Sequence, residues 1–594
     1  MATLYLKAAG GNWTNAATWS ATGSGGADSA GPPTAADDCI AETGSGNLTI
    51  SATSVGKSFS AIAGAGDWAG TLSHTLGNTF TISGNITFSA GMTLSIVTTS
   101  TIGINATGTI ITAGILMCSI NATAAITLGD NLNFRSGGAG SVSFILGAAS
   151  SLDMNGFSIN GFAANDRCLI TSNTYGTSRT LTVGGGSFSN CDFRDINFST
   201  PSDLDLSAIT GLSGDCGGNT ISGGGTVLTF TPSTTQTWTG TGATWDTIGR
   251  WTSRMPLPQD DVSMSGCTGG TVNVAKSMRL GRNIDWTGAT GTPTWTMASG
   301  TTEVFGSVTL ISAMNLTHTT FIFVFSGRGT HTITSAGKTW ASASSAVVVI
   351  NAVTGTYTLL DAFIKGSGTG ALTLLSGTFD ANIFNVTCGA SAGFASTTAL
   401  GSRVLNMGSG TWTISGGSGT PFNLGGVGLT VNCGTSTLAF TNTGASSKTL
   451  SGNSKVFNDL LISGGGAGGI IITGANTFNR IYTDGAGTKT ITIPGSATTT
   501  IISGLGLGNG TNVITFVASA GSATISKSSG VLSWDYVNLT NIPSTGGATF
   551  YAGSHSTDGG GNTGWNFTDA PATPGGRGSL GRIGAHTLSI GIGL

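Results

Sequence analysis

The sequence predicts an all-β protein in which short parallel strands stack, coil upon coil, into β-solenoids. Three observations lead to this class. Charged residues are scarce, with 25 Asp plus Glu and 22 Lys plus Arg among 594 residues, so the usual surface of an α-helix is missing. Runs of β-branched and aromatic residues, such as 79–88 and 321–325, recur between turns rich in the 98 glycines. Some of these runs also repeat at a fixed interval.

The clearest short repeat lies in the second half of the chain. Residues 455–464 (KVFNDLLISG) align with residues 476–485 (NTFNRIYTDG) at a shift of 21 positions, and residues 497–506 form a weaker echo after another 21. An apolar strand that ends in glycine at about this interval is typical of one solenoid coil. If most of the chain followed this period, it would form about 28 coils and a rod on the order of 130 Å long.

Stacking explains why the strands are both apolar and almost free of charge. A strand such as 469–473 (GIIIT) cannot bury its side chains alone, whereas coils stacked about 4.8 Å apart share one core and satisfy each other's backbone groups. A charge repeated in register would lie next to its own copy in every coil. Ser, Thr and Asn avoid that repulsion, and we expect them to form hydrogen-bonded ladders.

A longer repeat indicates that the chain contains two related units. Each unit opens with two tryptophans six residues apart, followed by a proline and by Asp-Asp, Lys-Ser and Asp-Trp pairs. Each closes with an aspartate 23 residues before the aspartate of a D-x-G-G-N-T motif. So many landmarks in one order indicate duplication. The matched positions are Trp13 and Trp245, Trp19 and Trp251, Pro33 and Pro258, Asp37-Asp38 and Asp260-Asp261, Lys57-Ser58 and Lys276-Ser277, Asp67-Trp68 and Asp285-Trp286, Asp192 and Asp535, and Asp215 and Asp558.

These landmarks divide the chain into two solenoid units with tryptophan-containing caps and a tail. The longer middle of the second unit carries the short repeat, and the tail is punctuated by Pro and Gly before an alternating apolar end. The predicted bounds are 1–232 for the first unit (opening segment 1–105, coils and closing segment 106–232), 233–568 for the second (opening segment 233–330, coils 331–530, closing segment 531–568), and 569–594 for a linker and C-terminal strand.

The paired tryptophans Trp13, Trp19, Trp245 and Trp251 are the candidate functional residues. Exposed aromatic rings can stack on sugar faces, which would make these positions glycan contacts. The alternative is that the rings pack over the open end of each solenoid, where a cap prevents end-to-end aggregation. We favour the cap, since most aromatic residues are packing residues.

The acidic residues do not form a recognisable catalytic or metal site in the sequence. The Asp-Asp pairs lack the Asp-rich loop that calcium requires, so we expect them to hold turns, and we expect Asp215 and Asp558 to form Asx turns. A glycosidase needs two juxtaposed carboxylates. Asp203 and Asp205 share a strand face, whereas Asp192 and Asp195 do not. Only the pair Asp203 and Asp205 is thus plausible within one strand. Because Glu and His are also scarce, we predict no enzyme activity, no cofactor and no metal.

Cysteine and histidine patterns support the same expectation. The eight cysteines have no C-x-x-C pair, so neither a zinc site nor a redox motif is indicated, and buried free thiols are expected. The five histidines lie far apart without metal-ligand spacing.

The charge balance and the N-terminal sequence constrain partners and location. A net charge of −3 gives no field for holding phosphates, so we expect no nucleic-acid partner. No apolar run reaches the roughly 18 residues that span a bilayer, and residues 1–11 lack the features of a secretory signal. We expect synthesis in the cytoplasm and no membrane insertion.

Several motifs together resemble a group of bacteriophage virion proteins of the tail-fibre or minor structural type. They are residues 11–20 (GNWTNAATWS), residues 33–38 (PTAADD), the F-N-x-L/I coils and residues 551–567 (YAGSHSTDGGGNTGWNF). The openings are also similar to repeats in bacterial surface adhesins with parallel β-helices. The second opening departs from the pattern, with Ala243-Thr244 before Trp245. The resemblance implies an architecture and brings no catalytic residues with it.

The resemblance implies a non-enzymatic virion structural protein, most simply a tail fibre or spike that meets the host surface. The expected partners are other copies of the chain, with a homotrimer favoured, other virion proteins, and host surface glycans. The expected location is the virion, assembled in the host cytoplasm. Two alternatives keep the same fold: a capsid decoration or head-fibre protein, and a polysaccharide depolymerase tailspike.

Overall fold

The structure is a computed structural model that describes residues 2–571, except for residues 64–65, 76, 90, 97–100, 112–114, 117–118, 136–141, 342–345, 390–392, 398–400, 464–468, 485–486 and 504–511. The strand predicted near the end of segment 569–594 and Cys118 therefore lie outside the described residues. Within them the protein is nearly all β, as predicted, and forms a β-solenoid of about 20 turns that is consistent with β-helix adhesin-like folds.

The first set of strands, called here the first stack, comprises β1 (Thr3–Leu6) to β31 (Leu228–Thr229). An 11-stranded sheet runs along it from β3 (Trp19–Ser20) through β1 and β4 (Asp38–Ile40) to β30 (Thr220–Ser222). An 8-stranded sheet forms a second side, from β6 (Ser54–Gly56) to β29 (Ser213–Asp215), and two 4-stranded sheets complete the coils. Neighbouring strands are parallel, apart from the β1–β3 pair and the β8–β9 hairpin (Ile62–Ala63 and Gly66–Asp67).

The remaining strands, β32 (Thr235–Thr237) to β65 (Trp565–Asn566), form the second stack. A 21-stranded sheet runs from β32 to β64 (Thr557–Asp558), and a 10-stranded sheet runs beside it from β41 (Thr339–Trp340) to β62 (Ser544–Thr545). Three of its strands are long, with 11 residues in β37 (Thr294–Val304), 11 in β39 (Asn315–Phe325) and 13 in β42 (Val347–Leu359).

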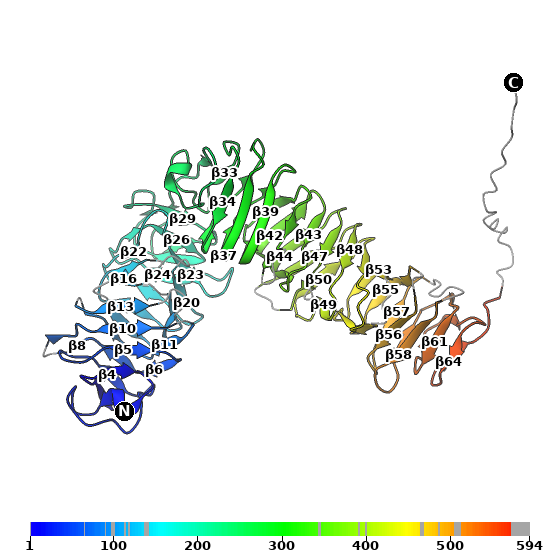
Figure 1. The fold of residues 1–594 in the computed structure, drawn as a ribbon, viewed down its shortest axis with the longest axis horizontal. Coiled ribbons are helices and arrows are strands. Elements are labelled where there is room, and N and C mark those ends of the chain that lie inside the picture. The colour runs from blue at the N-terminus through cyan, green and yellow to red at the C-terminus, as the bar shows by residue number, and fades with distance from the viewer. Residues whose placement is uncertain are drawn as a thin grey trace.

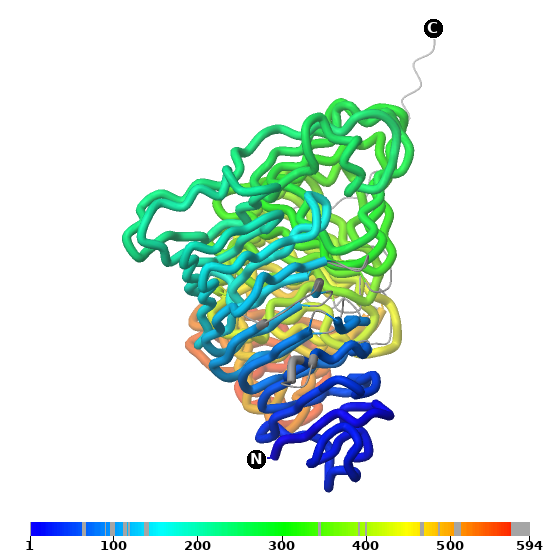
Figure 2. Tube along the Cα trace, turned by 90° about the vertical axis from the view of Figure 1, so that its left-hand side faces the viewer, coloured from blue at the N-terminus to red at the C-terminus, as the bar shows by residue number. Residues whose placement is uncertain are grey.

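Each stack has its own hydrophobic core. One cluster of buried side chains extends from Leu4 to Leu206 and the other from Trp238 to Trp565. Among the described strands, none of the first stack pairs with one of the second. Figure 1 shows the two stacks meeting at an angle, so that the molecule forms an arch with β33 (Asp261–Ser263) and β34 (Thr271–Val274) near its crown. Figure 2 shows the coils of the first stack lying one above another.

The 21-residue period is confirmed where it is clearest. Phe457 in β53 (Val456–Ile462) pairs with Phe478 in β55 (Thr477–Thr483), a step of 21. The weaker echo is wrong by two residues, since Phe478 pairs with Ile501. The estimate of about 28 coils is also too high, because many coils are longer: Phe144 pairs with Ile170, 26 positions on, and Leu152 with Leu181, 29 positions on.

Polar ladders and buried thiols follow the prediction. Asn133 and Asn160 bond across neighbouring coils, as do Asn406 and Asn432. The described cysteines are free, and only Cys433 among them is partly exposed. No helix in the described ranges has the length and apolar character needed to cross a membrane.

Candidate functional site

The four candidate tryptophans lie inside the two cores, at the start of each stack. Trp13, Trp19, Trp245 and Trp251 are at most 5% exposed, so their rings present no open face to a sugar in this structure. Trp19 donates its Nε1–H to the Trp13 carbonyl, and Trp251 does the same to Trp245, each at 2.9 Å. In each pair the rings meet edge to face, with centroids 4.8 and 4.9 Å apart. A role as end caps fits this position and stays a prediction.

The first aspartate of each Asp-Asp pair closes a turn, as expected. Asp37 accepts hydrogen bonds from the backbone N–H groups of Thr34 and Ala2, at 3.0 and 2.8 Å. Asp260 accepts the equivalent bonds from Leu257 and Thr234, at 2.9 and 2.8 Å. The two openings are therefore alike down to individual hydrogen bonds.

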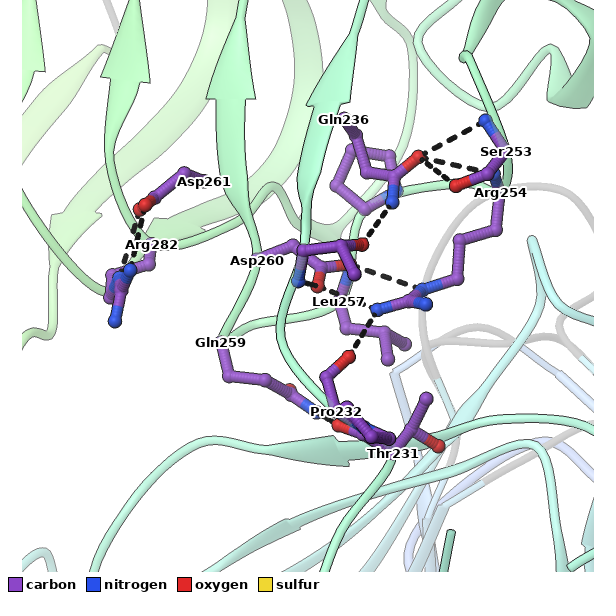
Figure 3. A network of polar contacts seen from close by, with 12 residues as sticks. Thr231, Pro232, Gln236, Ser253, Arg254, Leu257, Gln259, Asp260, Asp261 and Arg282 are labelled. Atoms are coloured by element: carbon purple, nitrogen blue, oxygen red, sulfur yellow. Dashed lines mark hydrogen bonds and ion pairs between the residues drawn. The ribbon is translucent and has the colours of Figure 1, made fainter. Parts of the chain in front are cut away.

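Asp260 differs from Asp37 in its surroundings. It is fully buried and also forms an ion pair with Arg254, whose Nη2 lies 2.7 Å from Oδ1. Figure 3 shows this network, in which Arg254 also donates to the Pro232 carbonyl at 2.8 Å. The opening of the second stack is thus tied to the segment that leads into it from the first.

The second aspartate of each pair forms an ion pair with a basic side chain on the next coil. Asp38 pairs with Lys57 at 2.8 Å, and Asp261 accepts a two-pronged contact from Arg282. The backbone N–H of Lys57 bonds to the Asp37 carbonyl, and that of Arg282 bonds to the Asp260 carbonyl. Lys57 therefore corresponds to Arg282.

The predicted match of Lys57-Ser58 with Lys276-Ser277 is wrong. The bonds to the Asp37 and Asp260 carbonyls place Arg282, six residues after Lys276, at the position of Lys57. Lys276 pairs instead with Asp246.

The tryptophans and the Asp-Asp pairs keep their correspondence. The match of Pro33 with Pro258 is also wrong, because the equivalent bonds of Thr34 and Leu257 place Pro256 at the position of Pro33.

Both D-x-G-G-N-T motifs form the predicted Asx turn. The Asp215 carboxylate accepts from the Gly217 N–H and from Asn219 Nδ2, both at 2.8 Å. Asp558 accepts from the Gly560 N–H at 2.9 Å and from Asn562 Nδ2 at 2.6 Å.

The aspartate expected 23 residues before each motif is not equivalent in the two copies. Asn219 Nδ2 bonds to the Phe193 carbonyl, whereas Asn562 Nδ2 bonds to the Leu539 carbonyl. Asp192 therefore corresponds to Asn538 and not to Asp535, because the loop before the second motif is three residues shorter.

The main cluster of buried charges lies where the two stacks meet. Asp192, on β26 (Cys191–Arg194), is 0% exposed and binds Arg167 of its own stack at 2.8 Å. Its other oxygen accepts from Nε of Arg279, on β35 (Met278–Arg279) of the second stack. Arg279 also donates to the Arg167 carbonyl at 3.0 Å, and Arg167 donates to the Pro256 carbonyl at 3.1 Å. One carboxylate thus joins a guanidinium from each stack.

A second group of charges lies beside the first. Arg194 donates to both carboxylate oxygens of Glu303, at 3.0 and 3.2 Å, and its guanidinium lies 4.1 Å from the ring centre of Tyr175. The Tyr175 hydroxyl donates to the same carboxylate at 3.2 Å. Arg328 of the second stack reaches Asp195 of the first at 2.6 Å.

Apolar and amide contacts complete this junction. Leu169 and Cys216 of the first stack pack with Phe305 of the second in a small cluster separate from both cores. Gln259 donates to the carbonyls of Ser213 and Thr231, at 3.0 and 2.8 Å, and accepts from the Asp215 N–H at 2.8 Å.

Burial and partner charges act in opposite directions at the junction. Burial raises the pKa of the Asp192 carboxyl, but Arg167 and Arg279 outweigh it and hold that pKa below its usual value. Burial lowers the pKa of Arg194, and Glu303 more than reverses the effect. Asp192 and Arg194 are therefore charged at neutral pH, and their ion pairs join the two stacks.

The carboxylates weighed for catalysis all have other partners. Asp192 and Asp195 face arginines in the junction. Backbone N–H groups of Thr226 and Val227 lower the pKa of Asp203, and Ser207 lowers that of Asp205. A general acid at neutral pH needs a raised pKa, and neither Asp203 nor Asp205 has one. Among the described residues, no group of three or more His, Cys, Asp or Glu is placed to hold a metal ion.

Sequence reasoning missed the junction, although one signal for it was present. Asp192, Arg194 and Asp195 crowd three charges into four positions of a chain that is otherwise almost uncharged. Their partners lie far along the chain, with Glu303 109 residues from Arg194.

Comparisons of the chain with models of protein families, with curated proteins and with solved structures found no match.

Proposed function

We propose that this protein is a non-enzymatic structural appendage of a bacteriophage virion, a tail fibre or spike that contacts the host surface. The observation that carries the proposal is the stacked architecture: parallel coils continue along each stack and keep the apolar side chains inside. Such a fold suits an elongated structural or adhesin-like protein. The motifs at 11–20 and 551–567 support the virion assignment through their resemblance.

The proposal includes self-association as a homotrimer, the binding of other virion proteins, and assembly in the host cytoplasm. Elongated fibres gain avidity when several copies present the same surface. Sedimentation of the purified chain tests this part. A trimer is expected, and a monomer at high concentration would refute it.

A groove on the first stack is the glycan-contact surface that we propose. It has a volume of about 450 Å³ and lies along β4, β7 (Ser58–Ser60) and β12 (Ile86–Thr87). Its lining includes the Asp38–Lys57 pair and the side chains of Ser83, Asn85 and Thr87. Hydroxyl, amide and carboxylate groups match the hydrogen-bonding groups of a saccharide.

Antibody labelling of purified particles tests the virion assignment. Antibodies raised against the chain are expected to label the tail. Labelling of the head would support the capsid alternative instead, and unlabelled particles that also lack the chain by mass spectrometry would refute the proposal.

Binding of the purified chain to host surface polysaccharide tests the proposed glycan contact in the groove. Ser83→Trp fills it and is expected to reduce binding of the purified chain to host surface polysaccharide at least tenfold. Thr430→Trp, on an exposed strand position of the second stack, is the matched control and should bind normally. Equal binding by both variants would refute the groove, and release of reducing ends from the polysaccharide would refute the non-enzymatic assignment.

A further inference from the structure

The buried charges of this protein are concentrated where the two stacks meet. Half of the buried Asp, Glu, Lys and Arg side chains in the described residues belong to this junction. The other half are spread along the second stack between Asp260 and Lys489, whereas these gather in one place, which calls for a specific role. Its six members are Arg167, Asp192, Arg194, Asp195, Arg279 and Glu303.

Four of the six charges lie on strands, and the two on β26 lie on a face that would otherwise point to solvent. Strand β26 is buried along its whole length, whereas a strand at the surface of a solenoid buries alternate residues. Its inward residues Cys191 and Phe193 belong to the first core, and its outward residues Asp192 and Arg194 bind the second stack. The second stack therefore docks on the outer face of the first, and does not continue it end to end.

The equivalent face at the end of the second stack is neutral. Hydrogen bonding to the two D-x-G-G-N-T motifs places Asn538 at the position of Asp192, Thr540 at that of Arg194 and Asn541 at that of Asp195. Asn541 even keeps the left-handed backbone of Asp195, with φ of 56° against 55°. The backbone at the two closures is alike, so the charges belong to docking and not to the closure.

Buried ion pairs are better suited to selecting one arrangement than to adding stability. Removing a charged group from water costs about as much as its partner returns, so a hydrophobic contact would hold the stacks equally well. A misplaced contact, however, leaves a charge buried without a partner, at a large cost. The pairs therefore penalise every docking angle except the one in which they all meet.

We propose that the junction charges fix the angle between the two stacks, so that the protein is one rigid bent body and not two stacks on a flexible linker. Asp192 with Arg167 and Arg279, and Arg194 with Glu303, select this angle. Because these groups are shielded from water, the angle is expected to be the same in 50 mM and 1 M NaCl. The inference does not depend on the proposed function.

Reversal and exchange of one pair test the proposal by small-angle X-ray scattering. Arg194→Glu places two carboxylates face to face at Glu303, and should broaden the distribution of interatomic distances and change the maximum dimension. Adding Glu303→Arg exchanges the charges and should restore the profile of the unmodified protein. Lys57→Glu, which reverses the exposed pair with Asp38 in the first stack, is the control and should leave the profile unchanged.

Each scattering result for these variants either supports or overturns the proposed role of the junction charges. If Arg194→Glu scatters like the unmodified protein, the pair does not set the angle and the proposal is wrong. If that variant loses its β-sheet circular dichroism, the exchanged double variant decides: a recovered profile supports the proposal, and a profile that stays broad overturns it. A change in maximum dimension between 50 mM and 1 M NaCl would also overturn it.

Discussion

Asp37 and Asp260 occupy the same position in the two openings, so replacing each by alanine compares one substitution in two environments. Asp37→Ala removes a partly exposed carboxylate that caps two backbone N–H groups, a loss of about 1 kcal/mol in local stability. Asp260→Ala removes the same two caps and also leaves the Arg254 guanidinium without its carboxylate in a buried network. Breaking a buried pair in this way costs about 3–5 kcal/mol.

Hydrogen exchange measured by mass spectrometry is the suitable assay, because a stacked protein opens locally and has no single unfolding free energy. A loss of 1 kcal/mol speeds exchange about fivefold, and a loss of 3–5 kcal/mol speeds it about 150- to 5,000-fold. Peptides covering residues 231–262 should show the larger change in Asp260→Ala, and peptides covering residues 2–40 the smaller one in Asp37→Ala. Equal acceleration at the two sites would refute the reasoning, since burial would then have no effect.

Three further predictions concern the second stack. Burial lowers the pKa of His318 to about 4, so as the pH falls the unfolded chain binds a proton near pH 6.5, before the folded protein does. The free energy of unfolding should therefore fall by about 1–2 kcal/mol between pH 6.5 and pH 4, and thermal melts of His318→Gln should show a smaller decline. Phe457 and Phe478 stack at 5.4 Å, so a double-mutant cycle with leucine should show a coupling of about 0.5–1.5 kcal/mol, and additive effects would contradict the register. Asn562→Ala removes the bonds to Asp558 and Leu539, so exchange should rise by about 10- to 100-fold in the last coil and stay unchanged in the first stack.

Local sequence signals predicted the coils well where one coil followed another without insertion. The step from Phe457 to Phe478 was correct because both coils share the same turn length. The next step failed at Ile501, since coil length depends on the loops, and loops tolerate insertions at little cost. The same reason explains why Asp535 was matched to Asp192: equal spacing to the closing motif concealed a three-residue difference in the loop.

Long-range contacts could not be predicted from repeats. The Asx turns of Asp215 and Asp558 involve residues within four positions and were recognisable in the sequence. The Asp192–Arg279 pair joins residues 87 positions apart on outer faces of different stacks. No periodic pattern in the sequence predicts such a pair. The one local signal is the high density of charged residues around Asp192.

The central claim is that parallel coils stack into two columns that meet at a fixed angle. Electron cryomicroscopy of the purified chain tests it most directly. The predicted map shows two arms in one bent outline, each crossed by strands about 4.8 Å apart, with the same angle in every particle class. A compact globular map, a map dominated by helices, or a single straight rod would contradict the account.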